Sequence, residues 1–199
     1  MKKNKFVRRH PLFKEHLYIV CEGIADEIFL DKFFKQFELK YEVKVIGSGS
    51  INNIFNTYKK IKAVYNDIIV IIFIDLDGKG DKNLKKIKDD FKNNGFKSIK
   101  DIYFVNPVIE YLFVLAKEDK HSMYTKKEDY KKDIKRLYRI DEYKGARKEC
   151  EKIVSLISLK EWEDFKTKIM NCNKEFNQLP STNLYKLLDR LKIKKESSN

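Results

Sequence analysis

Two apolar runs, each followed directly by acidic residues, dominate the hydrophobic pattern of the chain. The run I-I-V-I-I-F-I covers residues 68–74 and is rich in β-branched side chains. A continuous run of this kind is typical of a strand buried on both faces, as in parallel α/β sheets. The shorter run L-Y-I-V-C covers residues 17–21 and has the same character. Both runs therefore predict central strands.

Between these runs the pattern changes to helical periodicity. Ile28, Phe29, Phe33, Phe34 and Phe37 recur at the spacing of one helix face. Strands and helices alternate along the chain, which predicts right-handed crossovers and a parallel sheet with helices on both faces. The predicted strands are 17–21, 41–46, 68–74 and 101–105, and the predicted helices are 25–37, 51–66, 82–94 and 107–116.

The pattern changes again after residue 117, where charged residues alternate with sparse apolar positions, as in amphipathic surface helices. No glycine- or proline-rich linker separates this part. We therefore predict an α/β fold with a Rossmann-like, four-stranded parallel sheet over residues 17–116. A basic segment over residues 1–16 precedes it, and a mostly helical, basic extension over residues 117–199 packs on it. Near its end, Ser181 or Thr182 is the predicted cap of a last helix.

Acidic residues follow both central strands, where open α/β sheets bind their ligands. Asp75 and Asp77 end the segment 68–77, and Glu22 lies between the first strand and Gly23. In the strand order 2-1-3-4 the first and third strands are neighbours, so these acids would meet at the topological switch point. Clustered like charges add no stability there. A divalent cation, Mg²⁺ or Mn²⁺, would explain them, because Mg²⁺ prefers oxygen ligands and keeps waters for substrate phosphates.

Three further acids are considered together with this predicted site. Asp26 and Glu27 occupy the first turn of the helix that follows Glu22. They complement the helix dipole, which is worth ~0.3–1 kcal/mol each, or they bind metal. Glu110 lies in an otherwise apolar helix, which we expect to begin at Pro107 because of its fixed φ. A carboxylate buried there needs a partner.

A glycine-containing loop separates the second predicted strand from its helix. Gly47, Ser48, Gly49 and Ser50 form the sequence G-S-G-S. Glycines before a helix can expose backbone N–H groups to a phosphate, which makes the four residues candidate substrate contacts. The spacing matches neither a P-loop nor a dinucleotide fingerprint. The alternative is that Ser50 simply caps the helix.

The 199 residues carry a formal net charge of +13, unevenly spread. The excess is +5 over residues 1–16, +1 over residues 17–116 and +7 over residues 117–199. Basic regions around an acidic, cation-dependent centre fit a nucleic-acid substrate. The alternative is that the lysine-rich composition reflects AT-rich coding and solvated helix surfaces.

Cysteine spacing and hydropathy indicate the cellular compartment in which we expect the protein. Cys21, Cys150 and Cys172 match no zinc spacing and no disulfide framework, so we expect a reducing cytoplasm. Cys21 is expected to pack as a small hydrophobe at the end of its strand. No run approaches the ~20 apolar residues of a membrane span, and the N-terminus lacks an apolar signal core.

At its acidic positions the chain resembles the Toprim superfamily of topoisomerases, primases and old-lysogenization-type nucleases. The pattern of that family is Glu-Gly after the first strand and Asp-x-Asp after the third, matched here by Glu22-Gly23 and by Asp75 and Asp77. The nuclease branch adds an acid shortly after the first Glu, which Asp26 matches. The segment N-P-V-I-E-Y-L, residues 106–112, resembles a signature of the RloB-like branch, linked to bacterial restriction and abortive infection.

The resemblance implies a Mg²⁺- or Mn²⁺-dependent nuclease that hydrolyses phosphodiester bonds in DNA or RNA, including tRNA, as the effector of a bacterial anti-phage defence system. It implies that Glu22, Asp75 and Asp77 hold one ion and that Asp26 or Glu27 holds a second. Glu110 would orient a neighbour or support the metal ligands.

A positive residue would then stabilise the developing phosphorane charge, and Lys79 and Lys144 are the candidates. These 199 residues contain neither the ATPase domain that old-lysogenization nucleases carry nor a tyrosine-nucleophile domain, so a topoisomerase is not expected. Two alternatives stay open. One is a phosphotransfer enzyme related to primases, and the other is a non-catalytic Toprim-like module that binds or senses nucleic acid for a partner ATPase. The oligomeric state is also open, a homodimer included.

Overall fold

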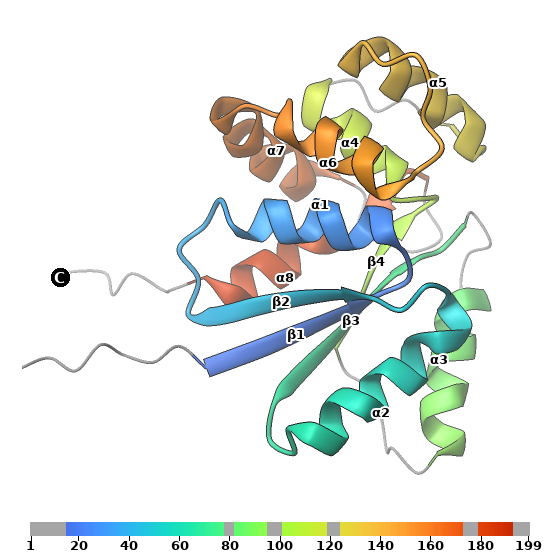
Figure 1. Ribbon diagram of the computed structural model, residues 1–199, viewed down its shortest axis with the longest axis vertical. Helices are drawn as coiled ribbons and strands as arrows, with labels where there is room; N and C mark the ends of the chain where they lie inside the picture. The colour runs from blue at the N-terminus through green and yellow to red at the C-terminus, as the bar shows by residue number, and fades with distance from the viewer. Residues whose placement is uncertain (1–14, 78–81, 95–100, 119–123, 173–178, 193–199) are drawn as a thin grey trace, which may run out of the picture.

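The computed structural model describes residues 15–77, 82–94, 101–118, 124–172 and 179–192. They form a mixed five-stranded sheet with helices on both faces (Figure 1). The strand order is β2-β1-β3-β4-β5, and β1 to β4 run parallel. The strands are β1 (Glu15–Cys21), β2 (Tyr41–Gly47), β3 (Ile69–Asp75), β4 (Ile102–Asn106) and β5 (Ser181–Thr182).

The α/β class, the parallel core and the order of its first four strands are confirmed. The prediction of a four-stranded sheet was wrong, because the C-terminal region adds β5 antiparallel to β4. Ser181 and Thr182 pair with Asn106 and Val105. The prediction that Ser181 or Thr182 caps the last helix was wrong in position, because Asn183 is its N-cap, although Thr182 Oγ1 accepts a hydrogen bond from Leu184 N at 3.2 Å.

Helices cover the two faces of the sheet unequally. In Figure 1, α2 and α3 lie on one face, and α1 lies with α4 to α8 on the other. The C-terminal region is therefore mostly helical, as predicted. The helices are α1 (Ile24–Phe34), α2 (Ile54–Val64), α3 (Lys82–Asn93), α4 (Glu110–Lys117), α5 (Lys127–Tyr138), α6 (Arg147–Ser155), α7 (Leu159–Asn171) and α8 (Leu184–Leu191), with a short 3₁₀ turn η1 (Ile51–Asn53) before α2.

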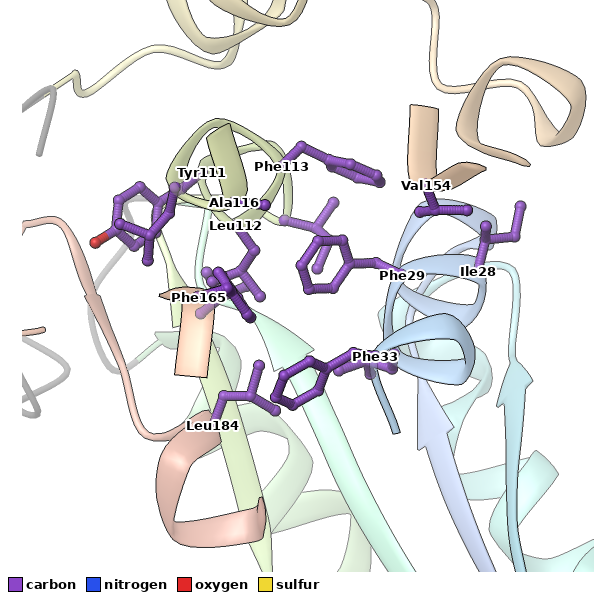
Figure 2. Packing of buried hydrophobic residues seen from close by; sticks show 14 of the residues in the cluster. Ile28, Phe29, Phe33, Tyr111, Leu112, Phe113, Ala116, Val154, Phe165 and Leu184 are labelled. Carbon is purple, nitrogen blue, oxygen red and sulfur yellow. The ribbon is translucent and has the colours of Figure 1, made fainter. Parts of the chain in front are cut away.

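The larger core packs around Phe29 of α1 (Figure 2). Its ring makes edge-to-face contacts with Phe113 of α4 and with Trp162 and Phe165 of α7, at centroid distances of 4.9, 5.4 and 5.4 Å. Such pairs contribute ~0.5–1.5 kcal/mol beyond the apolar area that they bury. The helix after the first strand is thereby fixed against helices more than 80 residues away in sequence.

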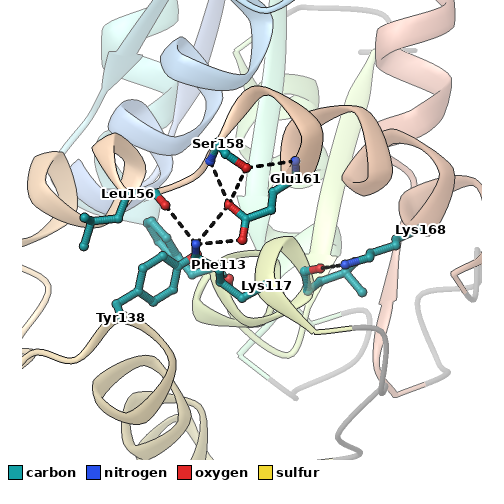
Figure 3. Close-up of polar contacts among 8 residues, drawn as sticks. Phe113, Lys117, Tyr138, Leu156, Ser158, Glu161 and Lys168 are labelled. Carbon is teal, nitrogen blue, oxygen red and sulfur yellow. Dashed lines mark hydrogen bonds and ion pairs between the residues drawn. The ribbon is translucent and has the colours of Figure 1, made fainter.

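Polar contacts fix the C-terminal end of α4 (Figure 3). Lys117 Nζ donates to the Leu156 carbonyl at 2.8 Å and to both carboxylate oxygens of Glu161 at 2.7 and 2.9 Å. The Tyr138 hydroxyl of α5 donates to the Phe113 carbonyl at 2.8 Å. Lys168 of α7 donates to the Leu115 carbonyl at 3.2 Å. Three elements thus hold the position of α4, whose first residue is Glu110.

The predicted start of this helix at Pro107 was wrong, because α4 begins at Glu110. The preceding residues form a turn in which Tyr111 N and Leu112 N donate to the carbonyls of Val108 and Ile109 at 3.0 and 2.9 Å. No helix in the described ranges combines the length and apolar character needed to cross a membrane. Cys21 is fully buried at the end of β1, as expected.

Candidate acidic site

The carboxyl ends of β1 and β3 lie side by side and position the acidic residues. Cys21 and Phe73 are register partners, and β3 continues to Asp75. The chain after β1 turns at Gly23 into α1, which puts Asp26 in the first turn of that helix. Asp26 and Asp75, distant in sequence, are thus brought close enough for their charges to interact.

Both carboxyl groups of this pair are buried, with 3% of Asp26 and 7% of Asp75 exposed. One oxygen of each has a backbone donor. Gly23 N donates to Asp26 Oδ2 at 3.0 Å, and Ile109 N donates to Asp75 Oδ2 at 3.1 Å. The two Oδ1 atoms are buried and have no donor among the described residues. Two neighbouring buried carboxylates repel each other, so the pair favours a bound proton or a cation.

The pKa of Asp26 is raised to about 7: burial raises it most, hydrogen bonding lowers it, and the nearby charges of Glu22 and Glu110 add to the rise. Burial likewise raises the pKa of Asp75 well above its usual range, with added repulsion from Asp26 and Glu110. Two carboxyl groups that share a desolvated site cannot both ionise without a counter-charge. Glu22, half-buried after the end of β1, lies within electrostatic range of Asp26.

Glu110 provides a third buried carboxylate and has its own cation. Its side chain is fully buried, and Lys127 Nζ lies 3.0 Å from Glu110 Oε1. The Tyr143 hydroxyl donates to the same oxygen at 3.4 Å. Burial alone would lower the pKa of Lys127, but attraction to Glu110, Asp75 and Asp26 raises it above its usual value. Lys127 therefore remains charged beside the acidic site.

Sequence reasoning missed Lys127. The only signal in the sequence was Glu110 itself. A carboxylate buried in an apolar helix requires a partner, but the sequence does not show which residue that partner is. Lys127 opens α5, in a region with many lysines, so nothing in the local sequence distinguishes it.

Glu27, predicted as a metal ligand, has other partners. Its Oε2 accepts the Gly47 N–H at 2.9 Å, and its Oε1 pairs with Arg147 at 2.8 Å. A Cβ at Gly47 would lie 2.9 Å from Glu27 Oε2, so this contact requires glycine. The structure thus uses Glu27 to tie α1 to β2 and α6, and it does not bring this carboxylate to the Asp26–Asp75 pair.

The remaining predicted residues lie at the surface or outside the described ranges. Asp77 is exposed, with a left-handed backbone at φ 52°. Lys79 lies outside the described residues. The Lys144 ammonium is exposed and pairs with Glu142 at 2.8 Å.

The loop of residues 47–50 lies against the backbone of the acidic site. Ser48 N and Ser48 Oγ both donate to the Cys21 carbonyl at 2.9 Å, and Oγ lies 3.3 Å from the Glu22 carbonyl. Gly49 adopts φ +84°, a conformation suited to glycine. Ser50 occupies the N-cap position of η1, as the capping interpretation expects, but its side chain makes no capping hydrogen bond. Phosphate contact by this loop stays a prediction.

Comparisons with protein-family models, with curated proteins and with solved structures found no match. The chemistry of the site therefore rests on its own geometry. Within the described ranges, no three His, Cys, Asp or Glu side chains gather closely enough to hold a metal ion by themselves. Mg²⁺ usually needs only one or two carboxylates, together with waters and substrate phosphates. The Asp26–Asp75 pair, with two buried oxygens that lack donors, fits such an ion.

This geometry predicts that the stability of the protein falls as the pH rises from about 4 to about 7. The pKa of Asp26 is about 7 in the folded protein and near 3.8 in the unfolded chain, so only the folded protein holds this proton between those values. Its contribution, at most about 4 kcal/mol at ~1.36 kcal/mol per unit, is complete below about pH 4 and lost as the pH approaches about 7. Melting temperatures of the wild type and of Asp26→Asn across this range would measure it.

Added Mg²⁺ should replace the missing proton, so it should raise the melting temperature more at about pH 8 than at about pH 5. Asp26→Asn should reduce both the pH dependence and the Mg²⁺ shift. An equal shift in wild type and variant would place the ion elsewhere.

Proposed function

We propose that this chain is a Mg²⁺-dependent phosphodiesterase that hydrolyses nucleic acid. The observation that carries the proposal is the buried Asp26–Asp75 pair, whose Oδ1 atoms have no donor in the described structure. The pair lies beside the carboxyl ends of two adjacent parallel strands. A protein gains no stability from such a pair, since its repulsion and desolvation oppose folding at neutral pH. A site that must bind a cation and a phosphate explains it.

The residues of the chain have distinct roles in this proposal. Asp26 and Asp75 hold the ion through the oxygens that lack donors, while the Gly23 and Ile109 N–H groups fix the other oxygens and so the orientation of both carboxylates. Glu22 adds a further carboxylate within electrostatic range of Asp26. When bound, the metal supplies Lewis-acid polarisation of the scissile phosphate.

Lys127 supplies positive charge beside these acids. Its side chain is 43% exposed, so the ammonium borders solvent while it pairs with buried Glu110. A phosphodiester that reaches the Asp26–Asp75 pair would bring negative charge close to this ammonium. Such a fixed charge stabilises a phosphorane-like transition state. Lys79 and Lys144 remain candidates for the same role from the sequence.

Nucleic acid is the proposed substrate class because of charge. The net charge of +13 favours a polyanion, and phosphate contacts supply most of the affinity in such complexes. The Toprim-like spacing of Glu22-Gly23 and of Asp75 and Asp77 agrees with this chemistry, and the likeness to the RloB-like branch makes anti-phage defence the proposed setting.

A second candidate function is a binding module without catalysis. It is favoured by one observation, that the described acids do not form a group of three around a common point. Such a module would bind nucleic acid through its basic surface and pass the signal to a partner such as an ATPase.

A cleavage assay separates the two candidates. Purified full-length protein is incubated with single- and double-stranded DNA and RNA, with Mg²⁺, with Mn²⁺ or with EDTA, and binding is measured in parallel. The proposal expects cleavage that requires metal, together with binding that weakens steeply as salt rises. Binding that survives chelation without any cleavage would support the binding module instead.

A further inference from the structure

Strand β2 forms an outer edge of the sheet (Figure 1). It pairs with β1 over all seven of its residues, and within the described chain no strand pairs with its other side. A groove of about 920 Å³ follows this edge. Its apolar lining comes from the end of α1, the loop after it and β2, and includes Phe34, Phe37, Leu39, Tyr41, Val43 and Val45.

The hydrogen bonds show which backbone groups of β2 face outward. Gly47 is the register partner of Cys21, yet it is Ser48 N that donates to the Cys21 carbonyl. In a parallel ladder a residue bonds to the two neighbours of its register partner, and the partner's own N–H and C=O point away from it. The backbone groups of Gly47 therefore point away from β1. Gly47 N accordingly meets Glu27 and not β1. The direction of the backbone N–H and C=O groups alternates from one residue of a strand to the next. The outward direction therefore also applies to Val45, Val43 and Tyr41.

Side chains along β2 alternate in the same register. Tyr41, Val43 and Val45 are half-buried on the α1 side of the sheet, while Glu42 and Lys44 are exposed on the opposite face. The edge therefore combines unused backbone donors and acceptors with a partly covered apolar row. Natural edge strands of this length are usually covered or paired.

We propose that a second copy of this chain pairs with β2 in antiparallel fashion, with the two-fold axis at Val43. This register joins Val43 to its own counterpart and Tyr41 to Val45 of the other copy, through the backbone groups that face outward. On the exposed face it places Glu42 opposite Lys44 of the other copy, twice by symmetry. The surface is thus self-complementary in charge, as a two-fold interface requires.

The contact at Gly47 favours this register over its neighbour. An axis shifted two residues to Val45 would need the Gly47 N–H for an interchain bond, but Glu27 Oε2 already accepts it. That shift would also place Lys44 opposite Ile46 and lose the charge pairs. The axis at Val43 uses only backbone groups that the monomer leaves open.

A charge-swap series measured by sedimentation velocity tests the proposal on the full chain, at an ionic strength near 0.15 M, where screening (a Debye length of about 8 Å) limits the repulsion between two +13 copies. Wild type is expected to form dimers as its concentration rises. Glu42→Lys alone and Lys44→Glu alone each put like charges opposite one another twice, which should weaken dimerisation about tenfold. The double variant E42K/K44E restores opposite pairs and should restore dimerisation.

The double variant also controls for contacts inside one chain, since Glu42 pairs with His16 and Lys44 lies over the Tyr18 ring. A loss caused by those contacts would persist in the double variant and would overturn the proposal.

Val43→Pro is the complementary test. Proline removes the outward N–H of Val43 but no bond to β1, and edge strands tolerate proline on that side. The variant should be monomeric, with a melting temperature near that of the wild-type monomer. A wild type that stays monomeric up to its solubility limit, or a dimer indifferent to Val43→Pro, would refute pairing through β2.

Discussion

Replacing Asp75 with asparagine is expected to abolish metal-dependent cleavage of nucleic acid while leaving binding intact or slightly stronger. The substitution removes one of the two carboxylates proposed to hold the ion, and it preserves shape and the hydrogen bond from Ile109 N. The loss of rate should exceed the ~10–100-fold usual when a group that only supports a metal ligand is removed. Affinity should not fall, since a negative charge disappears near the phosphate path.

The variant Asp31→Asn is a matched control, because Asp31 lies on the same helix as Asp26 but pairs with Lys35 at the surface. It should cleave at the wild-type rate. Asp75→Asn should also melt at a higher temperature than wild type without metal, since it relieves the repulsion with Asp26. Full activity in Asp75→Asn would remove the Asp26–Asp75 pair from the mechanism.

The variant Asp77→Ala tests whether the sequence motif or the observed geometry identifies the residues that hold the metal ion. The Toprim-like pattern makes Asp77 a metal ligand, whereas the structure places it at the surface after β3. If the motif describes the working site, Asp77→Ala should lose as much cleavage as Asp75→Asn, with binding unchanged. A mild effect would assign the chemistry to the buried pair and Glu22.

The parallel core was predictable because its signals are local. A β-branched run such as residues 68–74 fits a doubly buried strand, and the helical spacing of Phe29 and Phe33 marks the buried face of α1. The strand order followed from one further condition, that the acids after the first and third strands should meet. β5 gave no such signal, because two residues carry no periodicity and their pairing with β4 depends on tertiary contacts.

The residues of the candidate site also differ in whether a local sequence signal could predict them. Asp26 and Asp75 were predictable, since both lie next to a strand end whose position the sequence indicates. The partners of Glu27 and Glu110 were not, because Arg147 and Lys127 come from distant helices and are two among 43 basic residues. Which lysine or arginine meets a buried acid is decided by how α4, α5 and α6 pack, and sequence periodicity alone does not fix that packing.

Replacing Lys127 with methionine is expected to destabilise the protein, because it leaves the fully buried Glu110 carboxylate without its cation. Breaking a buried pair by removing one partner costs ~3–5 kcal/mol. Lys127 is 43% exposed, so water already screens the pair and the expected loss is nearer 2 kcal/mol. For a chain of this size that corresponds to a fall in melting temperature of roughly 4–8 °C. Thermal unfolding at neutral pH would measure it.

The double variant Glu110→Gln/Lys127→Met is the decisive control. It removes the buried charge together with its partner, so it should recover most of the lost stability, and Glu110→Gln alone should cost less than Lys127→Met alone. A double variant as unstable as Lys127→Met would show that lost packing of the lysine stem, and not an unpaired carboxylate, is the cause. If the stable double variant binds nucleic acid but does not cleave it, while Glu110→Gln alone still cleaves, the Lys127 charge acts on the substrate and not only on Glu110.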